Sequence, residues 1–188
     1  MQDIPSLGRF PGVAAADMPA DQAAALEQLV GNRATVPAPY RVWLQSPGFT
    51  ACMDSLGRYL RYDSALTPRE TELVILACAR HCRAAFVFAA HSRLGRQAGL
   101  SDAIIDAIAR DQAPGLDDGR EQCIFDVAVA MLSEPTVSAQ LYQRAVATLG
   151  HRLIVEVIGL LGLYRATAYT MKFYDVPAPA VAATPSQG

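Results

Sequence analysis

A glutamate and a histidine stand in two consecutive segments whose other residues are largely apolar. Glu72 lies at helical spacing from Ile75 and Leu76, and His91 lies at helical spacing from Leu94. A carboxylate that points inward is costly unless it has a partner, and a glutamate beside an imidazole is an ordinary arrangement for proton transfer. The pattern therefore predicts a proton-transfer pair, and a satisfied structural pair in the core is the alternative.

Four cysteines offer a second chemistry, because Cys78, His81 and Cys82 fall within little more than one helical turn. With His91 they could supply four ligands to a tetrahedral metal ion, but the spacing is not a usual zinc pattern. A disulfide between Cys78 and Cys82 is disfavoured, because β-carbons at i and i+4 are about 5–6 Å apart and a bridge needs roughly 3.5–4.5 Å. We expect these cysteines to be packing residues, with no bound metal and no cofactor.

Glu156 is a third charged residue in an apolar stretch. Arg152 precedes it by one helical turn, so an ion pair within the helix is the simpler interpretation. A functional role for Glu156, as for Cys78 and Cys82, stays open at this point.

The elements that must position Glu72 and His91 are two adjoining helices. Thr67 and Glu70 form a capping-box pattern around a proline at the first helical position, which predicts a helix over 68–81. A second helix is expected from about 84 to 98, followed by a glycine. Because only a few residues connect the two, they are predicted to pack as an antiparallel hairpin that lets the two polar side chains meet.

No segment shows the alternation of a strand, so the predicted fold is all-α. We expect one helical domain over 1–176, after a loose N-terminal segment, and a Pro/Ala-rich tail over 177–188 that has little to bury. A loop is expected over 32–39. The remaining helices are predicted at 19–30, 40–45, 49–62, 101–110, 117–133, 138–149 and 151–174.

Composition narrows the function classes. The 188 residues are 52% hydrophobic and only 18% charged, with a net charge of −2. This balance argues against nucleic acid or an anionic membrane as a partner, and the shortage of charge suggests that part of the surface is covered. We expect no export signal, because the first 16 residues contain no long apolar run. We also expect no membrane span, because the most apolar stretch, 153–164, is short and contains Glu156. A cytoplasmic protein is expected, and no phosphate-binding loop, serine elbow or dinucleotide fingerprint is found.

The segment LTPRETELVILACARH, residues 66–81, is followed by FVFAAH, which ends at His91. Together they resemble the carboxymuconolactone decarboxylase family, which includes the alkylhydroperoxidase D type. The segments 40–48 and 163–177 are similar to the decarboxylase-like branch. The resemblance implies an alkylhydroperoxidase D-like helical fold built round an antiparallel hairpin. It also implies a small-molecule substrate and a homo-oligomer, a trimer or a hexamer, with sites near subunit boundaries.

Position by position, Glu72 matches the glutamate of the family and His91 matches its histidine. The Cys-x-x-Cys of the peroxidase branch falls on Ala84 and Val87, so both thiols of a peroxide-reducing cycle are missing. Decarboxylase-like relatives carry an aromatic–acidic–aromatic triplet before the histidine. Here the triplet 86–88 reads Phe-Val-Phe and has lost the acid.

The resemblance implies a lyase that acts on a small organic acid or lactone. His91 would be the general acid or base that delivers a proton to the carbanion left by carbon dioxide, and Glu72 would hold and polarise it. Arg80, Arg83 or Arg93 could bind a substrate carboxylate, because a guanidinium matches that group with two hydrogen bonds.

Two alternatives remain. A thiol-dependent peroxidase, an oxidoreductase, would have to use Cys78 and Cys82. A non-catalytic oligomeric ligand-binding protein would have a closed neighbourhood around Glu72 and His91, with no pocket beside them.

Overall fold

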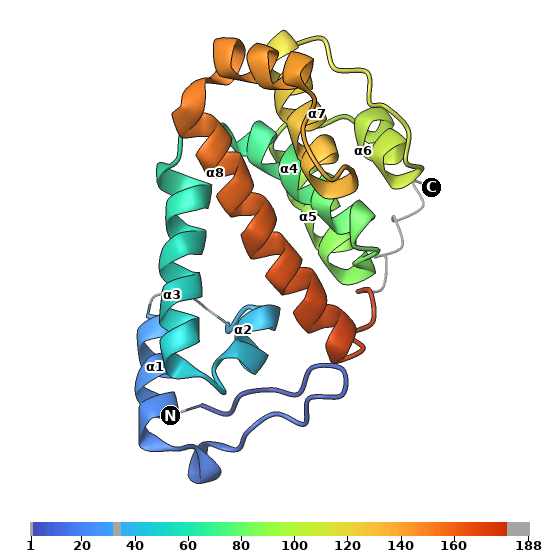
Figure 1. Ribbon diagram of the computed structural model, residues 1–188. Coiled ribbons are helices and arrows are strands. Elements are labelled where there is room, and N and C mark those ends of the chain that lie inside the picture. Colours follow the sequence, from blue (N-terminus) through green and yellow to red (C-terminus); the bar gives the residue numbers. More distant parts are fainter. Residues whose placement is uncertain (1, 32–34, 180–188) are drawn as a thin grey trace, which may run out of the picture.

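Helices make up nearly all the regular structure in the computed structural model, which describes residues 2–31 and 35–179. The chain folds into a layered bundle in which α8 runs diagonally between α3 on one side and the α4–α5 hairpin on the other (Figure 1). In chain order the helices are η1 (Ala15–Asp17), α1 (Ala20–Val30), α2 (Ala38–Trp43), α3 (Pro47–Arg58), η2 (Tyr59–Asp63), α4 (Pro68–His81), α5 (Ala85–Gln97), α6 (Asp102–Ala109), α7 (Gly119–Ser133) and α8 (Ala139–Phe173). The predicted all-α class is confirmed.

Helix α4 lies at the centre of the bundle, packed against α5, α7 and α8. Every residue over 70–79 is buried, so this helix has no solvent face in its middle turns. The predicted capping box starts it: the Thr67 hydroxyl accepts from the Glu70 N–H at 3.1 Å, and the Glu70 carboxylate accepts from the Thr67 N–H at 2.8 Å. Arg120 donates to the same carboxylate at 2.6 Å, which compensates the buried charge.

Helix α3 differs from the single helix predicted over 49–62. It begins at Pro47 and ends at Arg58, and the chain continues as η2, a five-residue π-helical turn. Helix α3 packs against α2 at Gly57, where a β-carbon would lie 3.4 Å from the Tyr40 hydroxyl. A π turn is wider than an α turn, so the residues of η2 face directions that α-helical periodicity does not predict.

Helix α8 joins the two segments predicted over 138–149 and 151–174. Its backbone breaks at Gly150, where φ is 72° and ψ is 162°, a conformation that favours glycine. By length and composition α8 could cross a bilayer, a test that core helices of soluble proteins also pass, and 39% of its most apolar window is buried inside the structure. Its inner face is therefore part of the core.

The N-terminal segment, predicted to be loose, is packed. Two antiparallel bridges pair Ile4 with Val13 and Leu7 with Phe10, and the Arg9 N–H donates to the Tyr174 carbonyl at 2.7 Å. Three apolar side chains of this segment, Ile4, Leu7 and Phe10, are buried, which explains why it docks near the end of α8 (Figure 1). Residues 177–179 are exposed coil, and the rest of the predicted tail, like 32–34 of the predicted loop, lies outside the described residues.

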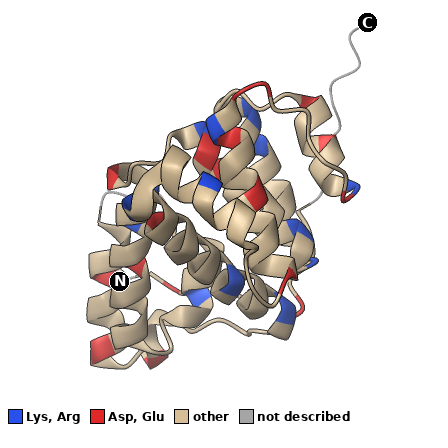
Figure 2. Cartoon of the chain, turned by 45° about the horizontal axis from the view of Figure 1, so that its top comes forward, with Lys and Arg blue, Asp and Glu red and all other residues tan. Residues whose placement is uncertain are grey.

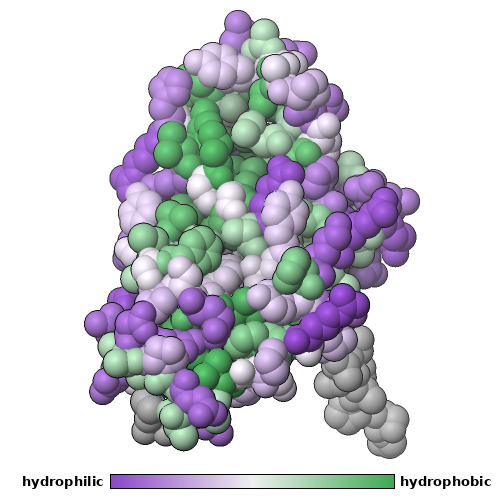
Figure 3. Space-filling view, turned by 60° about the horizontal axis from the view of Figure 1, so that its bottom comes forward, coloured by the Kyte–Doolittle hydropathy of each residue, from purple (hydrophilic) through white to green (hydrophobic). Residues whose placement is uncertain are grey.

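The surface is poor in charge, and long stretches of the helices carry none (Figure 2). Hydrophobic residues reach the surface between more hydrophilic edges (Figure 3). Four large apolar side chains lie on one face of α8 and are 43–75% exposed; we call them the α8 stripe. They are Val155, Ile158, Tyr169 and Phe173.

Candidate functional site

The α4–α5 hairpin brings Glu72 and His91 together. The Glu72 Oε2 atom lies 2.7 Å from the His91 Nδ1 atom, and the residues are only 5% and 8% exposed. The contact that the sequence spacing predicts is therefore present. Because the carboxylate occupies Nδ1, the other ring nitrogen, Nε2, is left for chemistry.

A cavity of about 380 Å³ lies beside this pair and is lined by His91 itself. Four elements besides α5 supply its walls, and most of the lining side chains are apolar or aromatic, as is usual for small-molecule sites. The lining includes Tyr40 and Trp43 of α2, Arg58 of α3, Arg61 and Tyr62 of η2, and Tyr164 of α8. A pocket adjoins the pair, so the closed neighbourhood expected of a non-catalytic protein is not found.

Among the described residues, Arg61 is the cation that forms an ion pair with Glu72. One of its terminal nitrogens lies 3.9 Å from the Glu72 Oε1 atom, and its side chain is 31% exposed. Burial alone would lower the pKa of Arg61, but the neighbouring Tyr164, Tyr62 and Glu72 raise the pKa above its ordinary value. Arg61 is therefore a fixed positive charge at the cavity wall.

Tyr164 forms another wall of the cavity. Its ring meets the His91 ring edge to face, with the ring centroids 4.9 Å apart. Burial raises the pKa of Tyr164 despite the nearby Arg61, so its phenol stays protonated. Tyr164 is thus both buried and in contact with the candidate site.

The three arginines predicted to bind a carboxylate do not line this cavity. Arg80 faces a different hollow, between α6 and α7, and Arg83 and Arg93 are exposed. Arg58 and Arg61 supply the cavity's positive charge instead. Sequence spacing missed them because they come from the end of α3 and the π turn, not from the helices that carry Glu72 and His91.

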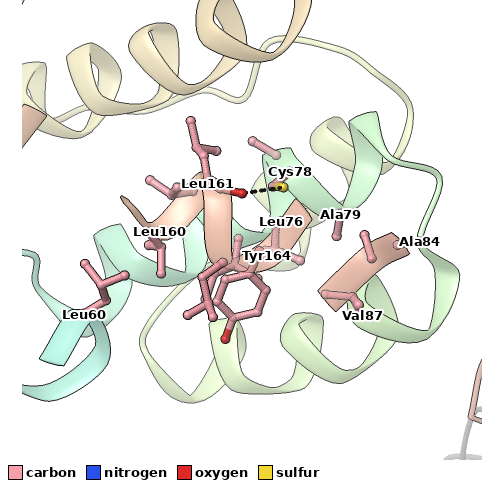
Figure 4. Packing of buried hydrophobic residues seen from close by; sticks show 14 of the residues in the cluster. Leu60, Leu76, Cys78, Ala79, Ala84, Val87, Leu160, Leu161 and Tyr164 are labelled. Atoms are coloured by element: carbon pink, nitrogen blue, oxygen red, sulfur yellow. Dashed lines mark hydrogen bonds between the residues drawn. The ribbon is translucent and has the colours of Figure 1, made fainter. Parts of the chain in front are cut away.

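The cysteines lie away from this chemistry, and all four are free. Cys78 is buried among apolar side chains, with its Sγ atom 3.8 Å from the Leu161 carbonyl (Figure 4). Burial, and then the neighbouring Cys82, raises the pKa of Cys78 to about 12. Neither Cys78 nor Cys82 lines the cavity. No cluster of three or more potential metal ligands occurs among the described residues.

Glu156 has more partners than the predicted one. Arg152 donates to its Oε1 atom at 3.1 Å, as the one-turn spacing predicts. The Tyr59 hydroxyl also donates to Oε1, at 2.6 Å, and the Ala65 N–H donates to Oε2, at 2.8 Å. Burial by itself raises the pKa of Glu156, but these hydrogen bonds outweigh it and lower the pKa below the ordinary value. Glu156 is therefore held as a carboxylate.

Solved structures share this architecture. One is described as an alkylhydroperoxidase AhpD core, an uncharacterized peroxidase-related protein from Ralstonia eutropha JMP134. It is 13% identical, with a TM-score of 0.74 over 93% of this chain and 94% of that chain. The debrominase Bmp8 is similar in its apo form, at 9% identity and a TM-score of 0.69. Its C82A variant in complex with 2,3,4-tribromopyrrole is 11% identical, with a TM-score of 0.67. Both alignments cover 89% of this chain and 90% of the debrominase. The fold is the AhpD-like helical fold.

Residues 47–130 match the model of the carboxymuconolactone decarboxylase family, a range that runs from α3 through Glu72 and His91 into α7. Over that range the chain is similar to this family. No curated protein matches the chain.

Proposed function

We propose that this protein is a decarboxylase-like lyase that acts on a small organic acid or lactone in the cavity beside His91. The observation that carries the proposal is the 2.7 Å contact between Glu72 and a histidine that lines a cavity of about 380 Å³. The contact fixes one ring nitrogen and leaves the other for substrate. A cavity of this size, with aromatic walls and a cation, suits a small anionic molecule.

In the proposed reaction, a carboxylate group of the substrate leaves as carbon dioxide, and its bonding electron pair stays on the carbon. His91, protonated at Nε2, gives its proton to that carbon and later takes one from water, so the net reaction consumes one proton. Glu72 orients the ring through Nδ1 and places a negative charge beside it. Arg61 binds an anionic group of the substrate, in place of Arg80, Arg83 or Arg93.

The peroxidase alternative finds no support at this site. A peroxide-reducing cycle needs a reactive thiolate, whereas burial raises the pKa of the Cys78 thiol to about 12. Ala84 and Val87 occupy the two positions where the peroxidase branch carries cysteines. Val87, which replaces the acid of the decarboxylase-like triplet, lines the cavity and makes that wall apolar.

The direct test is to replace His91 with alanine and to assay γ-carboxymuconolactone and related unsaturated acids. The matched control is His81→Ala, because His81 is exposed at the end of the same hairpin's first helix. We expect turnover to fall by about 10²- to 10⁴-fold in His91→Ala and to be unchanged in the control. Wild-type turnover in His91→Ala would overturn the mechanism.

We also propose that the protein is a cytoplasmic homo-oligomer, a trimer or a hexamer. The support is the α8 stripe, whose large apolar side chains are exposed in the single chain. Exposed apolar side chains gathered on one face are typical of surfaces that bind another protein.

A further inference from the structure

A buried carboxylate outside the proposed proton-transfer pair lies against both ends of the π turn. Glu156 is 4% exposed. One of its oxygens accepts from Tyr59, the first residue of η2, and the other accepts from the N–H of Ala65, two residues beyond its end. The two bonds join segments about 90 residues apart in the chain. Glu156 therefore spans the whole turn and ties it to α8.

The same helix contacts the middle of the turn. Leu60 is 2% exposed, and a β-carbon at Gly159 would lie 3.6 Å from the Leu60 methyl groups. That distance is an ordinary van der Waals contact, so Leu60 packs against α8 at Gly159. The turn is thus fixed by a carboxylate at its ends and by an apolar contact between them. Such support matters because π-helical turns are rare and occur frequently at functional sites.

The turn carries the groups that face the cavity. Arg61, between the two anchored ends, places its guanidinium 3.9 Å from Glu72, and Tyr62 lines the same cavity. If the backbone of η2 tightened to an ordinary α-helical turn, the directions of its side chains would shift progressively along the turn. Arg61 would then leave the cavity wall.

We propose that Glu156 is a positioning residue that holds η2 in its π-helical form and so keeps Arg61 at the cavity. The inference deepens the proposed function and rests on it for the role of Arg61. It assigns Glu156 no contact with substrate, because Glu156 does not line the cavity. The ion pair with Arg152 is a separate surface feature, since the Arg152 side chain is 72% exposed.

The experiment compares hydrogen exchange over residues 59–66 with the kinetics of γ-carboxymuconolactone. In Glu156→Ala we expect exchange in this segment to be about tenfold faster or more, because the Ala65 N–H and the Tyr59 hydroxyl lose their acceptor. We expect KM to rise about tenfold, as in Arg61→Ala, with kcat changed less than about threefold. The double variant should have the KM of the worse single variant.

Graded and matched variants separate positioning from general destabilisation. Glu156→Gln keeps an acceptor for Ala65 and should have a smaller effect, and Tyr59→Phe removes one anchor only. Val157→Ala, a fully buried neighbour on α8, should lower the melting temperature without raising KM, and Arg152→Ala should change neither KM nor exchange over 59–66. If Glu156→Ala does not fold, Glu156→Gln and Tyr59→Phe still test the proposal.

The outcomes distinguish this inference from the proposed function. Unchanged exchange over 59–66 in the Glu156 variants overturns the inference, and so does a double-variant KM equal to the product of the two single effects. Faster exchange with a wild-type KM also overturns it. If even the wild-type protein turns over no lactone, the proposed function fails, and the exchange result alone decides whether Glu156 fixes η2.

Discussion

The coupling between Glu72 and His91 gives the sharpest prediction. Both side chains are nearly inaccessible, at 6% and 10% exposure, and their contact at 2.7 Å is short enough for a charge-assisted hydrogen bond. Replacing Glu72 with glutamine keeps an acceptor of the same size and removes the charge. The change therefore tests what the negative charge contributes, without opening a hole in the core.

The expected size follows from that geometry. A hydrogen bond to a charged group contributes about 1.5–3 kcal/mol, and little of this is screened at such low exposure. Glu72→Gln should then lower kcat/KM by roughly 10- to 150-fold. His91→Ala should lower it by about 10²- to 10⁴-fold, because it removes the proton donor itself. If Glu72 acts only through His91, the double variant should be no worse than His91→Ala.

The assay is steady-state kcat/KM with γ-carboxymuconolactone for the wild type, the two single variants and the double variant. Thermal unfolding of each variant shows whether the fold is retained. Two results would refute the reasoning: a Glu72→Gln protein with wild-type kcat/KM, or a double variant whose loss equals the product of the single losses. The second result would mean that Glu72 acts on the substrate independently of the imidazole.

Three further predictions concern other parts of the molecule. In the folded protein, iodoacetamide at pH 8 should label the exposed Cys52 quickly and the buried Cys78 very slowly, because the raised pKa of Cys78 keeps its thiol protonated. Mass spectrometry of the alkylated peptides measures the two labelling rates. Folding lowers the pKa of Glu156 from its ordinary value of 4.5, so its carboxylate stabilises the folded state fully at pH values above 4.5. That stabilisation is lost as the pH falls through the lowered pKa. The free energy of unfolding, measured by chemical denaturation, should therefore fall less steeply on acidification in Glu156→Gln than in the wild type. An equally steep fall in both proteins would contradict this prediction. Substituting both Val155 and Ile158 with aspartate should shift the proposed oligomer towards monomer in light scattering, while an unchanged mass would exclude this face from the interface.

Several features of the fold follow from local patterns in the sequence. The capping box at Thr67 and Glu70 and the break at Gly150 each depend on a few adjacent residues, and the structure has both. The meeting of Glu72 and His91 also follows, because a short connection forces two helices to pack side by side and their periodicity determines which side chains face inward. Residues close in sequence are positioned by backbone geometry alone, so sequence is sufficient for them.

The rest of the site required the tertiary structure. No local pattern in the sequence indicates the π turn after α3. Sequence spacing therefore points to arginines near Glu72 and His91, whereas Arg58 and Arg61 line the cavity. The sequence likewise indicates only the one-turn partner of Glu156, which is Arg152. The hydrogen bonds of Glu156 to Tyr59 and Ala65 join segments about 90 residues apart. The sequence by itself determined the helical class and the Glu72–His91 pair. Only packing of α8 against η2 decided which cation faces that pair, because contacts between distant segments depend on how whole helices dock.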